Sequence, residues 1–217
     1  MIMAVEQERI LQATEAFVRE RLAGDSTGHD WFHTARVTTL SRRLAQPEGA
    51  DIIVVGLAAL LHDIADWKFS GDEEASGREA QAWLAGQGVD EATSAHVVEI
   101  INSLSFKSVH QPRMRTLEGQ CVQDADRLDA LGAIGIGRTF AYGGWKGTPM
   151  YDPDIPPRLG MSAMEYRAHQ GTTVNHFYEK LLHLRDLMNT ATSPSQSDLF
   201  VEPMTPDQPP TLYLNYT

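Results

Sequence analysis

Residues 52–65 constrain the fold more than any other part of the chain. They are apolar nearly all round a helix, and the pair His62 and Asp63 stands near the end of this segment, in the run LAALLHDIADW. A helix that is apolar on every side is typical of the centre of a helical bundle. Because an unpaired buried charge is destabilising, the pair needs a compensating partner, and a divalent cation would supply one. The alternative is that Asp63 only caps a helix or pairs with Arg36.

Helical periodicity extends over most of the chain. Apolar residues in the first segment recur at helical spacing, at Ile10, Leu11, Phe17, Val18 and Leu22. Asp30 is a suitable N-cap for a second helix. Further helical patterns cover residues 73–85, 91–104, 117–140 and 161–188, whereas strand patterns are hard to find. The sequence therefore predicts an all-α fold, a bundle of helices.

The chain reads as one domain followed by a tail. Its 217 residues, 42% of them hydrophobic, suffice for one core, and no boundary is evident before about residue 190. Gly and Pro concentrate between residues 143 and 160, which predicts a functional loop such as a lid. We expect a domain over residues 1–190 and an extended or mobile Pro/Ser-rich tail over residues 191–217.

Charge and cysteine content exclude several classes of partner. The 18 Lys and Arg against 29 Asp and Glu give a net charge of −11, which disfavours nucleic-acid polymers and anionic membranes. No apolar run approaches the length of a membrane span, and the segment MIMAVEQERI does not resemble a secretion signal. The single cysteine, Cys121, excludes an intramolecular disulfide and a cysteine-based zinc cluster. We therefore expect a cytoplasmic protein that attracts any phosphate locally, through a metal ion or a few cations.

His33 is a candidate partner for the buried His–Asp pair. It lies four residues before Val37 and seven before Leu40, so it points from the helix face that packs into the core. A lone histidine in this place is usually a hydrogen-bonded core residue. Together with His62 and Asp63, however, it makes a set of ligand atoms that a metal ion could join.

A second group of carboxylates occurs in QDADRLDALGAIGIG. Asp124, Asp126 and Asp129 crowd the start of a helix, where the helix macrodipole stabilises some negative charge without any metal. Asp126 and Asp129 share a face that turns inward. Imidazole nitrogens and carboxylate oxygens without a thiolate suit Mn, Fe, Co, Ni or Zn, and can hold Mg.

The order and spacing of these pieces resemble the HD-domain metal-dependent phosphohydrolases. The phrases GHDWFHTARV, LHDIADWKF, NSLSF, VQDADRLDALGAIGIGRTF and NHFYEKLLHL resemble one bacterial subgroup of that family, which includes nucleotide pyrophosphohydrolases, over about residues 25–190. The resemblance implies an all-helical HD-domain bundle, a Mn or Mg ion, and phosphoester or phosphoanhydride substrates. It implies the metal ligands His33, His62, Asp63 and Asp126.

Polar residues around this predicted metal are candidates for catalysis and substrate binding. Asp63 could accept a hydrogen bond from a metal-bound water, Asp66 could orient that water or carry a proton, and Lys68 could hold a phosphate oxygen. For Asp66 and Lys68 the alternative is a solvated helix end. The candidates for substrate binding are His29, Arg36, Lys107 and Arg127. Each cation could equally be a structural ion-pair partner, and His29 a plain loop residue.

Three histidines recur every seven residues near the end of the domain. Seven helical residues span about 10 Å, so His169, His176 and His183 are too far apart to chelate one ion. We interpret them as a groove wall or a packing surface.

These features predict hydrolysis at phosphorus, helped by a metal ion that activates a water molecule. The expected partner is a small phosphorylated molecule. The resemblance implies that it is a nucleotide, and that the reaction could convert a nucleoside triphosphate to monophosphate and pyrophosphate. Two alternatives remain. One is an HD-type di-iron oxygenase, for which His96 is the obvious spare ligand. The other is a non-catalytic helical module that senses a nucleotide or a metal. The presence of all four ligands argues against this alternative, because such a module does not need the complete set.

Overall fold

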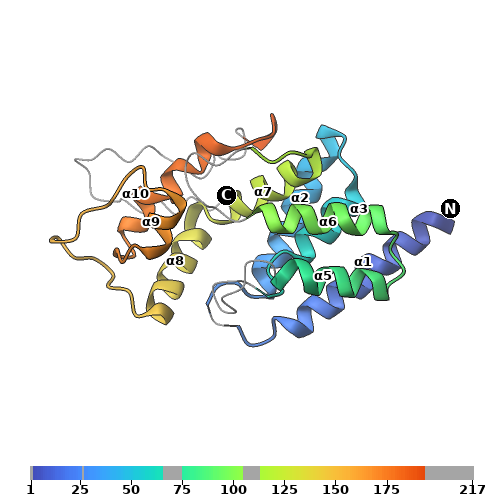
Figure 1. The fold of residues 1–217 in the computed structure, drawn as a ribbon, viewed down its shortest axis with the longest axis horizontal. Coiled ribbons are helices and arrows are strands. Elements are labelled where there is room, and N and C mark those ends of the chain that lie inside the picture. Colours follow the sequence, from blue (N-terminus) through green and yellow to red (C-terminus); the bar gives the residue numbers. More distant parts are fainter. Residues whose placement is uncertain (1, 26, 66–74, 105–112, 194–217) are drawn as a thin grey trace.

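The structure is a computed structural model that describes residues 2–25, 27–65, 75–104 and 113–193. Over these ranges the chain forms helices and no strands, which confirms the predicted all-α fold. One group of helices forms a bundle: α1 (Ile2–Arg21), α2 (Trp31–Glu48), α3 (Ile52–Leu61), α5 (Ala75–Gly86), α6 (Glu91–Leu104) and α7 (Leu117–Asp129). A second group lies at the other end of the molecule (Figure 1): α8 (Gly132–Lys146), α9 (Ala163–Ala168) and α10 (Asn175–Glu179). The 3-10 turns η1 (Leu181–His183) and η2 (Arg185–Leu187) follow α10, and Leu181 and Leu184 pack into the hydrophobic core of the bundle.

Helix α3 is the centre of the bundle, as its composition predicts. It contacts α1, α2, α6 and α7, and its residues from Val54 to Leu61 are all buried. Asp51 caps its N-terminus by accepting hydrogen bonds from the backbone N–H groups of Ile53 and Val54. The helix ends at Leu61, so His62 and Asp63 follow directly from the most buried segment of the chain.

Helix α2 packs against both α3 and α7. Asp30 is its N-cap, as predicted, and accepts a hydrogen bond from the His33 backbone N–H at 2.9 Å. The helix ends at Glu48, and its C-cap Gly49 has a φ of +78°, the left-handed conformation that glycine adopts without strain. His33, in the first turn of α2, is buried together with Val37.

The prediction of one helix over residues 117–140 is wrong. The helix stops at Asp129, and α8 begins at Gly132 in a new direction (Figure 1). Gly132 has a φ of +71°, and a Cβ on Gly135 would lie 2.1 Å from the carbonyl oxygen of Ala130. Glycine at these positions therefore permits a sharp turn that a continuous helix would not need. Because α8 runs to Lys146, the predicted loop over residues 143–160 begins only at Gly147.

The prediction of one helix over residues 161–188 is also wrong. That segment holds α9, α10, η1 and η2 in place of a continuous helix. The backbone N–H of Asn175, the first residue of α10, donates a hydrogen bond to the Thr172 hydroxyl at 3.1 Å. Thr173 packs so closely beneath α8 that a Cβ on Gly143 would lie 2.3 Å from its hydroxyl. The breaks therefore dock this segment onto α8.

The described chain continues past residue 190 into the first residues of the predicted tail. Thr192 donates a hydrogen bond to Glu48, and Ser193 is fully buried. The rest of that predicted tail, residues 194–217, lies outside the described residues. Among the helices of the described ranges, none combines the length and the hydropathy that a membrane crossing requires.

Candidate metal centre and adjoining pocket

Four side chains from three places in the bundle converge at one point. The Nε2 atoms of His33, on α2, and His62, after α3, lie 3.3 Å apart. Oδ2 of Asp63 lies 3.3 Å from each of them. Oδ1 of Asp126, on α7, lies 3.5 Å from Nε2 of His33. The two histidines and Asp63 offer ligand atoms within 4.8 Å of one another, and Asp126 is adjacent to this cluster.

The hydrogen bonds of the two imidazoles orient their lone pairs toward the same point. Nδ1 of His33 lies 2.7 Å from Oδ2 of Asp129, and Nδ1 of His62 lies 2.8 Å from the carbonyl oxygen of Ala59. Because a carboxylate and a carbonyl only accept, each Nδ1 donates, and each neutral ring has its lone pair on Nε2. Two lone pairs and a carboxylate then face one another, an arrangement that a cation stabilises. The donor set therefore fits a divalent metal ion.

The electrostatics of the cluster also favour added positive charge. His33 and His62 are 1% and 8% exposed. Burial lowers the pKa of His62, but the carboxylates of Asp63 and Asp126 outweigh this effect and raise it to about 9. For Asp63, burial raises the pKa, whereas the neighbouring His62 and His33 lower it further, to well below its usual value. The site thus attracts a cation, either a proton or a metal.

Asp129 holds His33 in place from the side of the ring that faces away from the metal centre. Its buried carboxylate contacts Nδ1 of His33 and accepts hydrogen bonds from Arg36 (Nε, 2.6 Å) and Arg138 (Nη1, 2.7 Å). Although burial raises its pKa, the hydrogen bonds from His33 and Arg36 hold it below its ordinary value. Arg138 also donates to the backbone carbonyl of Gly28, whose φ is +88°. Asp129 therefore links α2, α7 and α8 and fixes the orientation of His33.

The three aspartates of α7 have different surroundings. Asp124 is fully buried and accepts hydrogen bonds from Asn189, Thr190 and Ser193 in the C-terminal segment. Asp126 has a side chain that is 37% exposed, near His33. The carboxylate of Asp124 is therefore occupied within the fold, while that of Asp126 faces the candidate metal centre.

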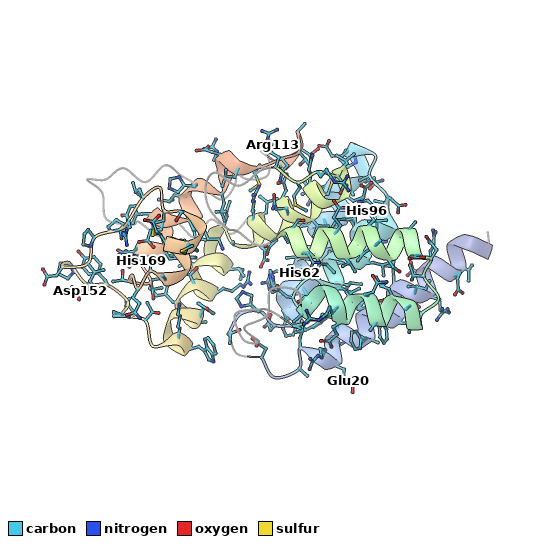
Figure 2. The ribbon with its side chains drawn as sticks, viewed as in Figure 1. Glu20, His62, His96, Arg113, Asp152 and His169 are labelled. Carbon is cyan, nitrogen blue, oxygen red and sulfur yellow. The ribbon has the colours of Figure 1, made fainter. Side chains whose placement is uncertain are left out.

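A pocket of about 570 Å³ adjoins this centre. His62, Asp63 and Asp126 line one part of it. The lining also includes residues of the second helix group, among them Arg138, Tyr142, Lys146, Tyr166, His169, His176, Glu179 and Lys180. Figure 2 shows His62 where the bundle faces α8, and His169 within the group formed by α9 and α10. The pocket thus lies between the two helix groups.

The predicted substrate-binding residues have different positions. His29 lines the pocket, with its ring 6.0 Å from that of His33 between centroids. Arg127 lines it as well, while its guanidinium donates to the backbone carbonyl of Leu187. Arg36 donates a hydrogen bond to Asp129 and does not line the pocket. The other candidates lie outside the described residues: Asp66, Lys68 and Lys107.

Two further interpretations concern the remaining histidines. His96, the spare ligand of the di-iron alternative, has its Nε2 3.7 Å from a carboxylate oxygen of Glu118 and does not line the pocket. His169 and His176 do line it, as a groove wall requires, whereas His183 does not. The interpretation of a groove wall therefore agrees with the positions of His169 and His176, but not with that of His183.

Sequence reasoning did not single out Arg138 and the role of Asp129. Asp129 stands one helical turn after Asp126 on the inward face, which was a usable signal for a residue at the site. Arg138 follows the break between α7 and α8, so helical spacing from α7 gives no guide to where it points. Its contact with Asp129 depends on the turn at residues 130–132.

Comparison with known proteins gives the relationship of the chain. The HD-domain family model matches residues 31–131. The uncharacterized protein YpgQ of Bacillus subtilis is 36% identical over 181 residues, which cover 82% of this chain and 80% of YpgQ.

Solved structures agree with this relationship. A Lactobacillus plantarum protein has a TM-score of 0.78 at 41% identity, with 88% of each chain covered. An HD-superfamily hydrolase of Bacillus thuringiensis has a TM-score of 0.66 at 45% identity, with 90% of each covered. The crystal structure of YpgQ in complex with ADP has a TM-score of 0.67 at 33% identity, covering 88% of this chain and 89% of that one. The chain belongs to the HD-domain family and has the fold of HD-superfamily hydrolases.

Proposed function

We propose that the protein is a metal-dependent phosphohydrolase that acts on a nucleotide. The observation that carries this proposal is the pair of buried imidazoles, whose Nε2 lone pairs face each other and a carboxylate beside a pocket. A helical protein that needed only a stable core would not bring these groups together, because unpaired lone pairs and buried charge are costly.

The residues that would hold the metal are His33, His62, Asp63 and Asp126. This nitrogen and oxygen set suits Mn and can accept Mg, and it also suits Fe, Co, Ni and Zn. When bound, such an ion lowers the pKa of a coordinated water and polarises a phosphoryl oxygen. Asp129 contributes by holding His33 with Nε2 toward the centre.

The remaining chemistry belongs to the side chains around this centre. Asp63, 3.3 Å from both imidazoles, accepts a hydrogen bond from the attacking water. Water adds to phosphorus, one phosphorus–oxygen bond of the ester or anhydride breaks, and the leaving oxygen takes a proton. His29 and Arg127 line the pocket and contact the substrate in this proposal. Lys68 and Lys107 stay candidates for holding a phosphate oxygen, and Asp66 stays a candidate for orienting the water or carrying a proton.

A nucleotide is the favoured substrate for two reasons. YpgQ, a relative that covers most of the chain, has been crystallised in complex with ADP. The pocket volume of about 570 Å³ is in the range of sites for small organic ligands, which exceeds the needs of a single phosphate. Cleavage of a nucleoside triphosphate to monophosphate and pyrophosphate is the specific reaction that we propose.

The test is metal analysis combined with a product screen. Purified protein should contain, or take up, close to one divalent ion for each cluster of His33, His62, Asp63 and Asp126, that is, about one ion per chain. With Mn²⁺ or Mg²⁺ it should release phosphate or pyrophosphate from nucleotides. The Asp63→Ala variant should lose both properties, whereas Glu99→Ala, which removes an exposed partner of Arg115, should lose neither. Metal binding without turnover of any nucleotide would favour the sensing alternative and contradict the proposal.

A further inference from the structure

The part of the pocket that lies away from the metal centre has its own chemical character. Five residues of the second helix group, which we call the distal wall, line it: Tyr142, Tyr166, His169, His176 and Glu179. They come from α8, α9, α10 and the residue that follows α9. Four of them carry rings, and hydrolysis of a phosphate beside the metal requires none of these.

The polar groups of the distal wall are arranged in two pairs. The Tyr166 hydroxyl and Nδ1 of His176 share a hydrogen bond of 3.1 Å. Nε2 of His169 lies 3.0 Å from Oε1 of Glu179, which also accepts a hydrogen bond from the backbone N–H of Arg158. Because the Glu179 carboxylate only accepts, His169 donates to it through Nε2. Each pair holds its rings in fixed orientations.

The charge of this wall makes it a poor place for phosphate. Glu179 is buried, so its carboxylate would repel a phosphoryl group. Burial raises the pKa of Tyr166, which keeps it a neutral phenol. Lys146 and Lys180 also line the pocket and can attract part of a phosphoryl chain, whereas the two pairs present rings and a carboxylate that is hydrogen-bonded to His169.

A row of rings connects the two parts of the pocket. The ring centroids of His33 and His29 are 6.0 Å apart, and those of His29 and Tyr142 are 5.9 Å apart. Aromatic faces beside fixed donors and acceptors are what proteins use to bind a nucleobase, by stacking and by hydrogen bonds to its edge.

We propose that the distal wall is the nucleobase site of this enzyme, so that a bound nucleotide extends from the metal centre to α9 and α10 (Figure 2). This inference rests on the proposed function for the location of the phosphates. Tyr166 and His169 are then specificity-determining residues. They act on the affinity for the base and not on the affinity for the phosphoryl groups.

The experiment compares two ligands that share one diphosphate group. Binding of ADP and of inorganic pyrophosphate to the Mn²⁺-loaded protein is measured by isothermal titration calorimetry. The wild-type protein should bind ADP at least about tenfold more tightly than pyrophosphate. Tyr166→Phe and His169→Gln should each weaken ADP binding about tenfold and change pyrophosphate binding less than about twofold.

A matched control and a stability measurement complete the test. Tyr151→Phe removes the hydroxyl of an exposed tyrosine that does not line the pocket, and it should change neither affinity. Thermal unfolding of Tyr166→Phe and His169→Gln checks that both fold. Equal affinities of the wild-type protein for ADP and pyrophosphate, or equal weakening of both ligands in the variants, would overturn the inference.

The inference and the proposed function fail in different ways. A protein that binds ADP in preference to pyrophosphate, and loses this preference in the variants, supports the nucleobase site even if it hydrolyses no nucleotide. A protein that hydrolyses nucleotides but binds both ligands equally well keeps the proposed function and contradicts the nucleobase site.

Discussion

Replacing Asp124 by Asn should unfold the protein more easily and leave its metal site intact. The Asp124 carboxylate is fully buried and accepts hydrogen bonds of 2.8–3.0 Å from Asn189, Thr190 and Ser193, through backbone and side-chain donors. In the Asn variant the amide nitrogen takes the place of Oδ2, and this nitrogen donates and cannot accept a hydrogen bond. The hydroxyls of Thr190 and Ser193 are 2.7 Å apart and can bond to each other, so the Thr190 N–H is the donor left without an acceptor.

The expected cost follows from these contacts. An unsatisfied buried donor costs about 1–3 kcal/mol, and loss of a hydrogen bond to a charged group costs about 1.5–3 kcal/mol. Because the two overlap, we expect a decrease of about 3 kcal/mol in the free energy of unfolding. That is a large part of the stability of a single domain.

The assay is urea unfolding in EDTA, combined with metal content after reloading with Mn²⁺. EDTA removes the contribution of bound metal to stability, so that the two properties are measured separately. Asp126→Asn is the matched control, because it makes the same chemical change two residues away. It should lose metal affinity and keep its free energy of unfolding within about 0.5 kcal/mol. The reasoning fails if Asp124→Asn loses metal while keeping its stability.

Three further predictions follow from the site and the core. His62→Ala should abolish metal binding and activity together, because it removes a ligand and leaves Asp63 misoriented; equilibrium dialysis that finds stoichiometric metal in the variant would contradict the assignment. Metal-free protein should lose stability as the pH rises from about 6.5 through about 9. The pKa of His62 is raised in the folded state, so the stability that its protonation contributes is complete below the unfolded pKa and is lost above the folded one. Metal-loaded protein should not show this loss, and identical pH dependence of the thermal midpoint in both forms would refute the argument. Cys121 should react with a thiol reagent at pH 8 only as fast as the protein opens, because burial raises its pKa to about 12; prompt reaction of the folded protein would contradict this.

The candidate metal centre is the part of the protein that local sequence predicts best. His62 and Asp63 end an apolar helix, and His33 shares a core-facing stripe with Val37, so each position follows from helical spacing alone. Helical spacing does not predict which carboxylate of α7 faces the metal centre and which are hydrogen-bonded within the fold. Asp124 is occupied by donors 65 to 69 residues later in the chain, a contact that no local pattern records.

The distal wall is the part that sequence periodicity misses. Residues 161–188 keep a helix-like spacing of apolar and histidine residues, but the chain breaks after Ala168 and again after Glu179. The breaks depend on tertiary contact, such as the fit of Thr173 beneath Gly143. A continuous helix would place His169 and His176 about two turns apart along one face. In the folded chain both line one pocket, His169 from the residue after α9 and His176 from α10.

The C-terminal contacts of Asp124 also determine when the chain can complete its fold. Burying α7 before Asn189, Thr190 and Ser193 are present would remove an anion from water with its hydrogen-bond donors missing. During synthesis on the ribosome, the helix that carries Asp126 can therefore dock stably only after residue 193 has emerged. Shortened versions of the protein should accordingly end beyond Ser193. Removal of this segment would leave the buried carboxylate of Asp124 without its donors, and the resulting partial unfolding would make the chain sensitive to proteolysis.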